Sequence, residues 1–265
     1  MNIGDLVVEP ISDGVLKAPA TAFKGTTEES WAPHRRFLDP DGMLAFALGG
    51  FLVRAPGDRL VLVDAGVGPG SGAIMGGTGQ YTGGELLDSM AAHTVRPEDI
   101  TDVVFTHLHF DHVGWASLDG ARVFPNATYR CDARDWAHFR ENERVRPILA
   151  PIEDRLTTWD GSGPLTPGVD TMSAPGHTPG STIIVLSSGA ARGLLLGDVV
   201  HCPVELLDDE WTGLGDVDPQ LAKRTRNALA REIEGTDTPV AAAHFPGMVF
   251  GRLLAANGRR SWVVP

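Results

Sequence analysis

Short apolar runs, separated by glycine, proline and charged residues, recur along the whole chain. Runs of this kind, bounded by turn residues, are typical of buried β-strands. The pattern predicts strands at residues 6–10, 45–53, 60–64, 102–105, 128–131, 169–173, 181–187, 193–196 and 239–243. Strands therefore extend from the beginning of the chain almost to its end.

Three segments are helix-like: residues 85–92, which follow a Gly-Gly break, residues 131–141, which mix charged and aromatic residues, and residues 218–234, the clearest case. The last segment opens with Asp218-Pro219, an N-cap followed by a first-turn proline, and Gly235 follows its end. Its apolar residues recur at intervals typical of one helix face. Strands that alternate with helices predict an α/β protein.

No linker rich in serine, glycine or proline divides the chain, and no short repeat is visible. Two apolar strands do end in similar loops, LVDAG at residues 62–66 and LLLGD at residues 194–198. We therefore expect residues 1–265 to form one domain that is built from two similar halves.

Three imidazoles and a carboxylate follow the predicted strand at 102–105, in the segment HLHFDH at residues 107–112. Imidazole nitrogen and carboxylate oxygen are the donors that divalent metals such as zinc accept. If the segment is extended, His107, His109 and Asp111 point to one side, and His112 lies on the next turn. The segment predicts a metal site, with a polar loop that binds no metal as the alternative.

Three more polar residues lie at or beside the ends of predicted strands. His177 is part of GHTPG at residues 176–180, Asp198 follows a strand and a glycine, and His244 ends the strand at 239–243. Each is weak alone, because a single histidine is more often a packing residue and a Gly-Asp pair is usually a turn. Together they favour one site, because α/β sheets assemble sites at the carboxyl ends of their strands.

The order HxHxDH, GHTPG, Gly-Asp and a strand-terminal histidine resembles the metallo-β-lactamase-fold hydrolase superfamily. The resemblance covers most of the chain and implies an αββα sandwich with a metal site at one edge of the sheets. It also implies the ligands of two metals: His107, His109 and His177 for one, Asp111, His112 and His244 for the other, and Asp198 as the bridge. Asp64 would orient a ligand or loop through a hydrogen bond.

Two adjacent divalent ions lower the pKa of a shared water and give a hydroxide nucleophile at neutral pH. Asp111 can bind this hydroxide and carry a proton toward the leaving group. The chain then needs no serine nucleophile, and it has no GxSxG motif. Zinc is the favoured metal, and manganese, iron and cobalt also fit.

Within this superfamily the motif is most similar to the N-acyl homoserine lactonases, which indicates hydrolysis of a small lactone or ester. A phosphotriesterase, a glyoxalase II-like thioester hydrolase and a metal-binding protein without activity are the alternatives. His201 stands where these lactonases usually carry a tyrosine, so it either donates a hydrogen bond to the substrate or only packs beside the site. By proximity to the motif, Phe110 and Trp115 are the expected pocket residues.

The net charge is −12, from 22 basic and 34 acidic residues, and no basic run is present. This disfavours a nucleic-acid partner or an anionic membrane surface and leaves a small-molecule substrate. The N-terminus does not resemble a secretory signal, and Cys131 and Cys202 form no CxxC pair, which indicates a cytoplasmic protein. A disulfide between these cysteines, the oligomeric state, including a homodimer, and the substrate itself are left open.

Overall fold

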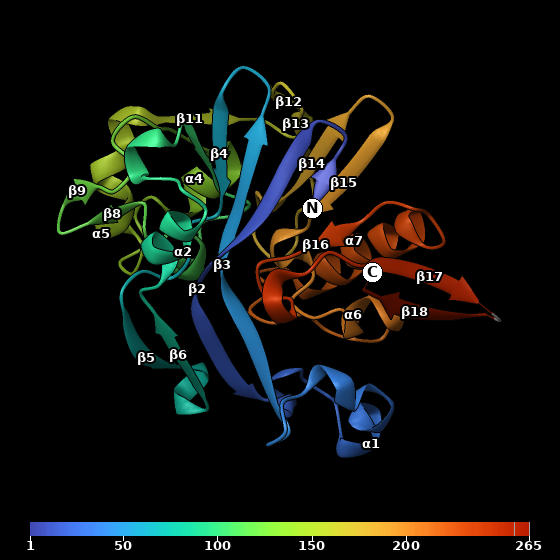
Figure 1. Cartoon of the computed structure of the whole chain (residues 1–265). Helices are drawn as coiled ribbons and strands as arrows, with labels where there is room; N and C mark the ends of the chain where they lie inside the picture. The colour runs from blue at the N-terminus through green and yellow to red at the C-terminus, as the bar shows by residue number, and fades with distance from the viewer. Residues whose placement is uncertain (257, 265) are drawn as a thin grey trace.

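The computed structural model describes residues 1–256 and 258–264. Most of its strands belong to two sheets (Figure 1). The first sheet has the order β11-β10-β7-β4-β3-β2-β6-β5, with β1 beside β2. Its strands are β1 (Asn2–Ile3), β2 (Leu6–Pro19), β3 (Met43–Ala55), β4 (Arg59–Val63), β5 (Gly70–Ile74), β6 (Gly79–Gly83), β7 (Asp102–Val104), β10 (Thr128–Asp132) and β11 (Leu156–Trp159).

The second sheet has the order β12-β13-β14-β15-β16. It contains β12 (Gly163–Thr166), β13 (Val169–Ser173), β14 (Thr182–Ser188), β15 (Ala191–Leu195) and β16 (Val240–Ala241). Two separate hairpins are formed by β8 (Ser117–Leu118) with β9 (Ala121–Arg122) and by β17 (Arg252–Ala256) with β18 (Arg259–Val263).

The helices are α1 (Glu28–Trp31), α2 (Leu86–Ala92), α3 (Phe110–Val113), α4 (Ala133–Phe139), α5 (Arg146–Leu149), α6 (Val204–Leu207) and α7 (Pro219–Ile233). Helices α2, α4 and α5 cover the outer face of the first sheet, and α6 and α7 cover that of the second, whereas α1 lies beyond the ends of β2 and β3 (Figure 1). Asp218 caps α7 as predicted, because its carboxylate accepts a hydrogen bond from Leu221 N at 2.9 Å.

Three apolar clusters define the layers. One lies between the sheets, where Val8 and Val61 of the first sheet share a cluster with Ile184 of the second. A second cluster lies between the first sheet and α2, α4 and α5, and a third lies between the second sheet and α6 and α7. Alternate strand residues point to opposite faces, so each sheet contributes to the central cluster and to one outer cluster. The predicted αββα sandwich is confirmed.

The parallel pairs bring several strand ends to one edge. Strand β7 pairs in parallel with both β4 and β10, and β15 pairs in parallel with β16. The loops that follow β4, β7, β15 and β16 contain Asp64, the HLHFDH segment, Asp198 and His244. The sheet order thus gathers predicted site residues that lie far apart in the sequence.

Some predicted elements are longer or shorter in the structure. The strand predicted at 6–10 continues to Pro19, and the segment 131–141 is a strand up to Asp132 and becomes helix α4 only at Ala133. Strands β5 and β6, with the sequences GSGAI and GQYTG, were not predicted. They form because their backbones pair with each other and β6 pairs with β2, although neither contains an apolar run.

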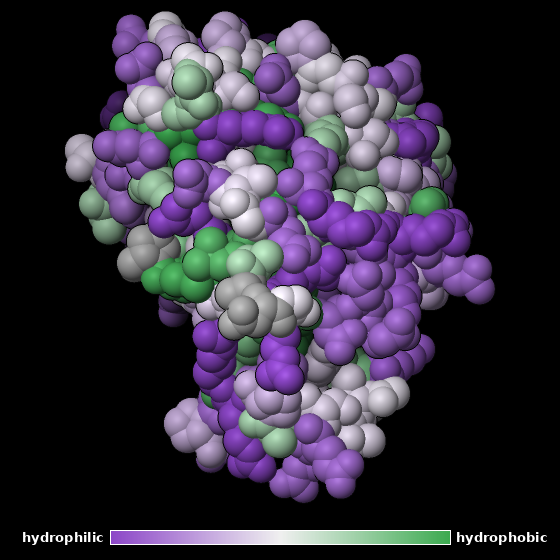
Figure 2. Space-filling view, turned by 90° about the vertical axis from the view of Figure 1, so that its right-hand side faces the viewer, coloured by the Kyte–Doolittle hydropathy of each residue, from purple (hydrophilic) through white to green (hydrophobic). Residues whose placement is uncertain are grey.

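The face that carries α7, β17 and β18 is largely hydrophilic (Figure 2). In the described residues, no helix is both long enough and apolar enough to cross a bilayer. Cys131 and Cys202 are both buried and free, so the disulfide that the sequence left open is not formed. That residues 1–265 act as one domain stays a prediction.

Candidate metal centre

The HLHFDH segment changes conformation in its middle. His109 has extended backbone dihedrals and is the N-cap residue of α3, whereas Asp111 and His112 lie inside this helix. The expectation that Asp111 extends in line with His107 and His109 is therefore wrong. The helical turn directs Asp111 and His112 to a different group of side chains.

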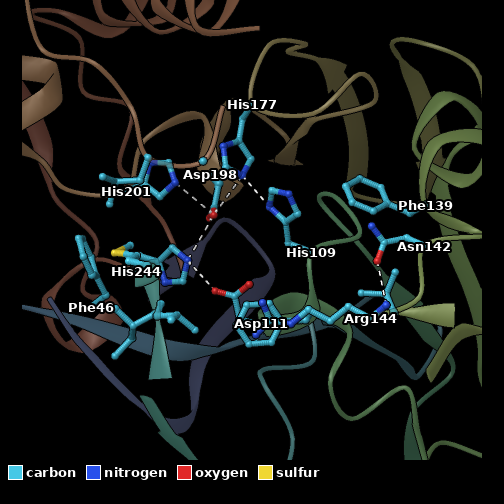
Figure 3. Close-up of a pocket in the computed structure, with 17 residues that line it drawn as sticks. Phe46, His109, Asp111, Phe139, Asn142, Arg144, His177, Asp198, His201 and His244 are labelled. Carbon is cyan, nitrogen blue, oxygen red and sulfur yellow. Dashed lines mark hydrogen bonds and ion pairs between the residues drawn. The ribbon is translucent and has the colours of Figure 1, made fainter. Parts of the chain in front are cut away.

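The first group consists of His107, His109, His177 and Asp198, whose donor atoms all lie within 4.8 Å of one another. His109 Nδ1 is 3.0 Å from His107 Nε2 and 2.9 Å from His177 Nε2. Asp198 Oδ2 lies 3.7 Å from His107 Nε2 and 3.4 Å from His177 Nε2. Residues from three separate loops thus point their donor atoms at one spot (Figure 3).

The second group consists of Asp111, His112 and His244. His244 Nε2 lies 3.4 Å from His112 Nε2 and 3.6 Å from Asp111 Oδ2. Asp198 also contacts this group, at 3.2 Å from His112 Nε2 and 3.3 Å from His244 Nε2. The structure therefore brings all seven predicted residues together, with Asp198 between the two groups.

Four of the histidines are oriented by an acceptor on their outer nitrogen. The Nδ1 atoms of His112 and His177 lie 2.9 Å from Asp64 Oδ2 and 3.0 Å from Asp216 Oδ1. His244 Nδ1 is 2.9 Å from the carbonyl oxygen of Ala47, and His107 Nδ1 is 3.1 Å from Thr106 Oγ1. For His112, His177 and His244 the partner is a carboxylate or carbonyl, which only accepts, so Nδ1 carries a proton and Nε2 is the nitrogen that faces the centre. The Thr106 hydroxyl donates to Asp64 Oδ2 at 2.8 Å and is left to accept from His107 Nδ1.

The electrostatics of the centre favour a cation. Burial, followed by the nearby His177, lowers the pKa of His109 to about 3, so its imidazole is neutral at pH 7. Burial lowers the pKa of His112, but Asp198 and Asp64 outweigh burial and raise it well above its usual value. The carboxylates that stabilise a proton on His112 would also stabilise a divalent ion.

These observations fit a metal centre. With zinc–nitrogen bonds of about 2.0–2.1 Å, tetrahedral geometry separates two ligand nitrogens by about 3.3 Å. The spacings of 2.9–3.4 Å between the imidazole nitrogens are close to this value. Asp198 Oδ1 is buried and accepts no hydrogen bond within the described part of the chain, which is costly unless a cation is its partner.

Asp135 and Asp13 are buried carboxylates that hold the surrounding loops, and neither was predicted from the sequence. Asp135 accepts hydrogen bonds from Leu108 N at 3.1 Å, Thr178 Oγ1 at 3.0 Å and Gly180 N at 2.6 Å. It therefore ties the loop of His109 to the loop of His177.

Asp13 is the second of these carboxylates and has no exposed surface. It accepts hydrogen bonds from the backbone of Val67, Gly68, Gly84 and Leu86 at 2.7–3.1 Å. It also accepts a hydrogen bond from Trp115 Nε1 at 2.7 Å. Trp115 is therefore a buried structural residue, and its predicted place in the pocket is wrong.

His201 lies beside the centre, with Nε2 at 3.4 Å from Asp198 Oδ2. Burial lowers its pKa, but the charge of Asp198 outweighs burial and raises the value to about 10. Behind the ring, Glu205 Oε2 accepts hydrogen bonds from the backbone of His201 and Cys202, at 2.6 and 3.0 Å. Glu205 in turn forms an ion pair with the buried Arg226 at 3.4 Å. The backbone of His201 is therefore held by a buried ion pair.

A cavity of ≈ 290 Å³ opens over the centre. Asp111, Asp198, His201 and His244 lie along one side of it (Figure 3). Phe110 lines it as predicted. The other apolar lining residues are Leu16, Phe46, Ile74, Met75, Phe139, Val145 and Leu214. Such a cavity, apolar with a few convergent polar groups, is typical of a small-molecule site.

The chain is similar to several known proteins. It is 26% identical to the N-acyl homoserine lactonase AiiA of Bacillus thuringiensis subsp. kurstaki over 190 residues, which cover 65% of this chain and 72% of that protein. It is 29% identical to metallo-beta-lactamase domain-containing protein 1 of Mus musculus over 177 residues, which cover 65% of this chain and 59% of that protein.

Two solved structures share the whole fold. AidC, a dizinc quorum-quenching lactonase, superposes with a TM-score of 0.83 at 23% identity, covering 100% of this chain and 96% of that one. AbOPH, a hydrolase of the beta-lactamase superfamily, superposes with a TM-score of 0.85 at 24% identity, and the match again covers 100% of this chain and 96% of that one. The sequence model of the metallo-beta-lactamase superfamily matches residues 50–244, which include all seven residues of the centre. The chain therefore belongs to the metallo-beta-lactamase superfamily and is a hydrolase of that superfamily.

Proposed function

We propose that the chain is a dinuclear metal-dependent hydrolase that cleaves a small lactone or ester. The observation that carries this proposal is the pair of His/Asp groups that share Asp198 at the side of an apolar cavity. His107, His109 and His177 would hold one divalent ion, Asp111, His112 and His244 the other, and Asp198 would bridge them. Zinc is the favoured metal because the donors are nitrogen and oxygen at near-tetrahedral spacing.

When bound, such ions lower the pKa of a water and polarise the oxygen of the substrate carbonyl. The protein supplies the remaining functions. Asp111 faces the cavity beside His244 and can accept the proton of the attacking water and return it to the leaving oxygen. His201 Nε2 faces the same space and can donate a hydrogen bond to the carbonyl oxygen or to the leaving oxygen.

The substrate class is supported by the fold relatives and by the cavity. AiiA and AidC are described as lactonases. The apolar lining suits the hydrocarbon part of a lactone or ester, and the polar side suits its carbonyl.

The test combines metal analysis with a substrate panel. We expect about two metals per chain by plasma mass spectrometry and hydrolysis of a γ-lactone or an aryl ester that stops on chelation and returns on metal addition. An aryl phosphotriester and a glutathione thioester serve as the competing substrates, compared by kcat/KM.

Matched variants separate the centre from the rest of the protein. His177→Gln and Asp198→Asn should lower kcat/KM at least about 100-fold, because the first replaces an imidazole nitrogen with a weaker amide donor and the second replaces a charged carboxylate that can contact both ions with a neutral amide. His138→Gln, an exposed histidine on α4 outside both groups, should leave activity unchanged. Hydrolysis that persists in Asp198→Asn protein, or in fully chelated protein, would contradict the proposal.

A further inference from the structure

The cavity has a second polar side that the proposed chemistry does not use. Asn142 and Arg144, on the turn between α4 and α5, line the cavity away from His201 and His244 (Figure 3). Arg144 is the one lysine or arginine among the cavity-lining residues that the structure describes. The cavity therefore joins the metal centre, an apolar wall and a single guanidinium.

The turn that carries Arg144 is well fixed. Asn142 Oδ1 accepts a hydrogen bond from Arg144 N at 3.0 Å, and the Asn142 carbonyl accepts from the backbone of Val145 and Arg146, at 3.2 and 2.8 Å. Val145 is buried and lines the cavity next to Arg144. The backbone of Arg144 is thus held at the cavity even though its side chain is exposed.

Among the described residues, the guanidinium of Arg144 has an aromatic partner and no acidic one. Its Cζ lies 3.4 Å from the centroid of the Phe110 ring, and this ring packs edge-on against Tyr81 at 5.6 Å. The neighbouring arginines differ, because Arg140 and Arg146 lie 3.5 and 3.8 Å from Glu141. In the described part of the chain, Arg144 forms no ion pair, so its charge is available to a ligand in the cavity.

A guanidinium that stacks on an aromatic ring keeps its N–H donors in the plane of the group, where they can bind a carboxylate in a bidentate manner. The amide nitrogen of Asn142 has no protein acceptor among the described residues and can add a further hydrogen bond. Because the protein has a net charge of −12, an anionic substrate is repelled overall unless a local cation compensates.

We propose that Arg144, assisted by Asn142, binds a carboxylate of the substrate, so that the substrate is a lactone or ester with an anionic group on the part remote from the scissile bond. This inference rests on the proposed function. The scissile carbonyl would lie at the metal centre, the hydrocarbon portion against Phe110 and Phe139, and the carboxylate at Arg144.

The test compares two 4-nitrophenyl esters of similar shape and different charge: the mono-4-nitrophenyl ester of glutaric acid, with its free carboxylate, and the same compound with that carboxylate replaced by a primary amide, each rate being corrected for spontaneous hydrolysis. Arg144→Gln removes the charge and keeps most of the side-chain length. Arg146→Gln is the matched control, because it lies two residues away and does not line the cavity. Both residues are exposed, so neither change should disturb folding, which thermal unfolding verifies.

We expect the wild-type protein to prefer the free acid. Arg144→Gln should lower kcat/KM for the acid about 10- to 100-fold, the range for loss of a charge-assisted hydrogen bond, chiefly through KM. The neutral ester should change less than about twofold, and Arg146→Gln should match the wild type on both substrates.

Two outcomes would overturn the inference alone: equal wild-type activity on both esters, or an equal loss on both in Arg144→Gln. Failure of the metal-loaded wild-type protein to hydrolyse either ester, or the lactones of the wider panel, would instead overturn the proposed function and this inference with it.

Discussion

Asp135 offers the sharpest test of how the centre is held together. Its two carboxylate oxygens accept three hydrogen bonds, from Leu108 N, Thr178 Oγ1 and Gly180 N. In Asp135→Asn, one oxygen becomes an NH₂ group that cannot accept. If that group replaces Oδ1, the backbone N–H of Gly180 loses its acceptor, and if it replaces Oδ2, the N–H of Leu108 does.

Either orientation leaves one buried backbone N–H without a partner. The Thr178 hydroxyl keeps a hydrogen-bond partner, because it can rotate toward Ser181 Oγ, 2.8 Å away. An unsatisfied buried donor costs about 1–3 kcal/mol of unfolding free energy. For a chain of this size, 1 kcal/mol changes the melting temperature by about 2–4 °C, so we expect Tm to fall by roughly 2–12 °C.

The change should also weaken metal binding at one group only. Leu108 and Gly180 flank the loops of His107, His109 and His177, whereas the second group is anchored by other contacts. Loss of such an orienting contact typically costs 10- to 100-fold in metal affinity. Competition with a chelator of known affinity should therefore show one ion bound more weakly and the other unchanged.

Asp132→Asn is the matched control. Asp132 is also buried and lies three residues away, but within the described residues its carboxylate accepts hydrogen bonds only from the backbone and guanidinium of Arg134. Because Asp132 caps α4 and forms no hydrogen bond to either ligand loop in the described part of the chain, its loss should change stability and leave metal affinity within about twofold of the wild type. An Asp135→Asn protein that melts like the wild type and binds both ions equally well would refute the reasoning.

Two further predictions concern the surroundings of the centre. Glu205→Gln should lower the unfolding free energy by about 3–5 kcal/mol, because it leaves the buried charge of Arg226 without its partner. Denaturant unfolding measures this change. A double variant, Glu205→Gln with Arg226→Met, that is no more stable than Glu205→Gln alone would argue against the explanation. Gly50→Ala should cost about 1–3 kcal/mol and weaken metal binding, because the added Cβ would lie 2.1 Å from the Asp64 carbonyl oxygen and displace the turn that supports His112. The same assays check it, and wild-type metal affinity would show that the turn tolerates the shift.

A site residue could be predicted when its role can be recognised from the short segment around it. His107, His109, Asp111 and His112 could be predicted because their chemistry is visible locally: an HxHxDH segment crowds donors that are costly to bring together without a cation. His177, Asp198 and His244 were weak signals alone, and they were predicted from their places at strand ends and from the resemblance to the superfamily. The strands that place them were found because buried strands require apolar runs. Phe110 was found because it lies inside the motif.

Three supporting residues could not be found in this way, whereas Asp64, which lies 2.9 Å from His112 Nδ1, was expected from the resemblance. Asp13, Asp135 and Glu205 stand in ordinary surroundings in the sequence, and their importance comes from the backbone N–H groups of distant loops that converge on them. A loop whose N–H groups are buried must find an acceptor, but the sequence does not say which carboxylate will be near. That choice is made only when the sheets pack.

The sequence by itself determined the layered α/β fold and the chemistry of the ligands, because apolar periodicity and donor type are properties of short segments. The structure showed how the donors of the HLHFDH segment divide between the two groups, because helix α3 turns Asp111 and His112 away from His107 and His109. It also decided which carboxylates hold the loops and where Arg144 lies on the cavity. These depend on distances between segments far apart in the chain, which the packing of the two sheets fixes.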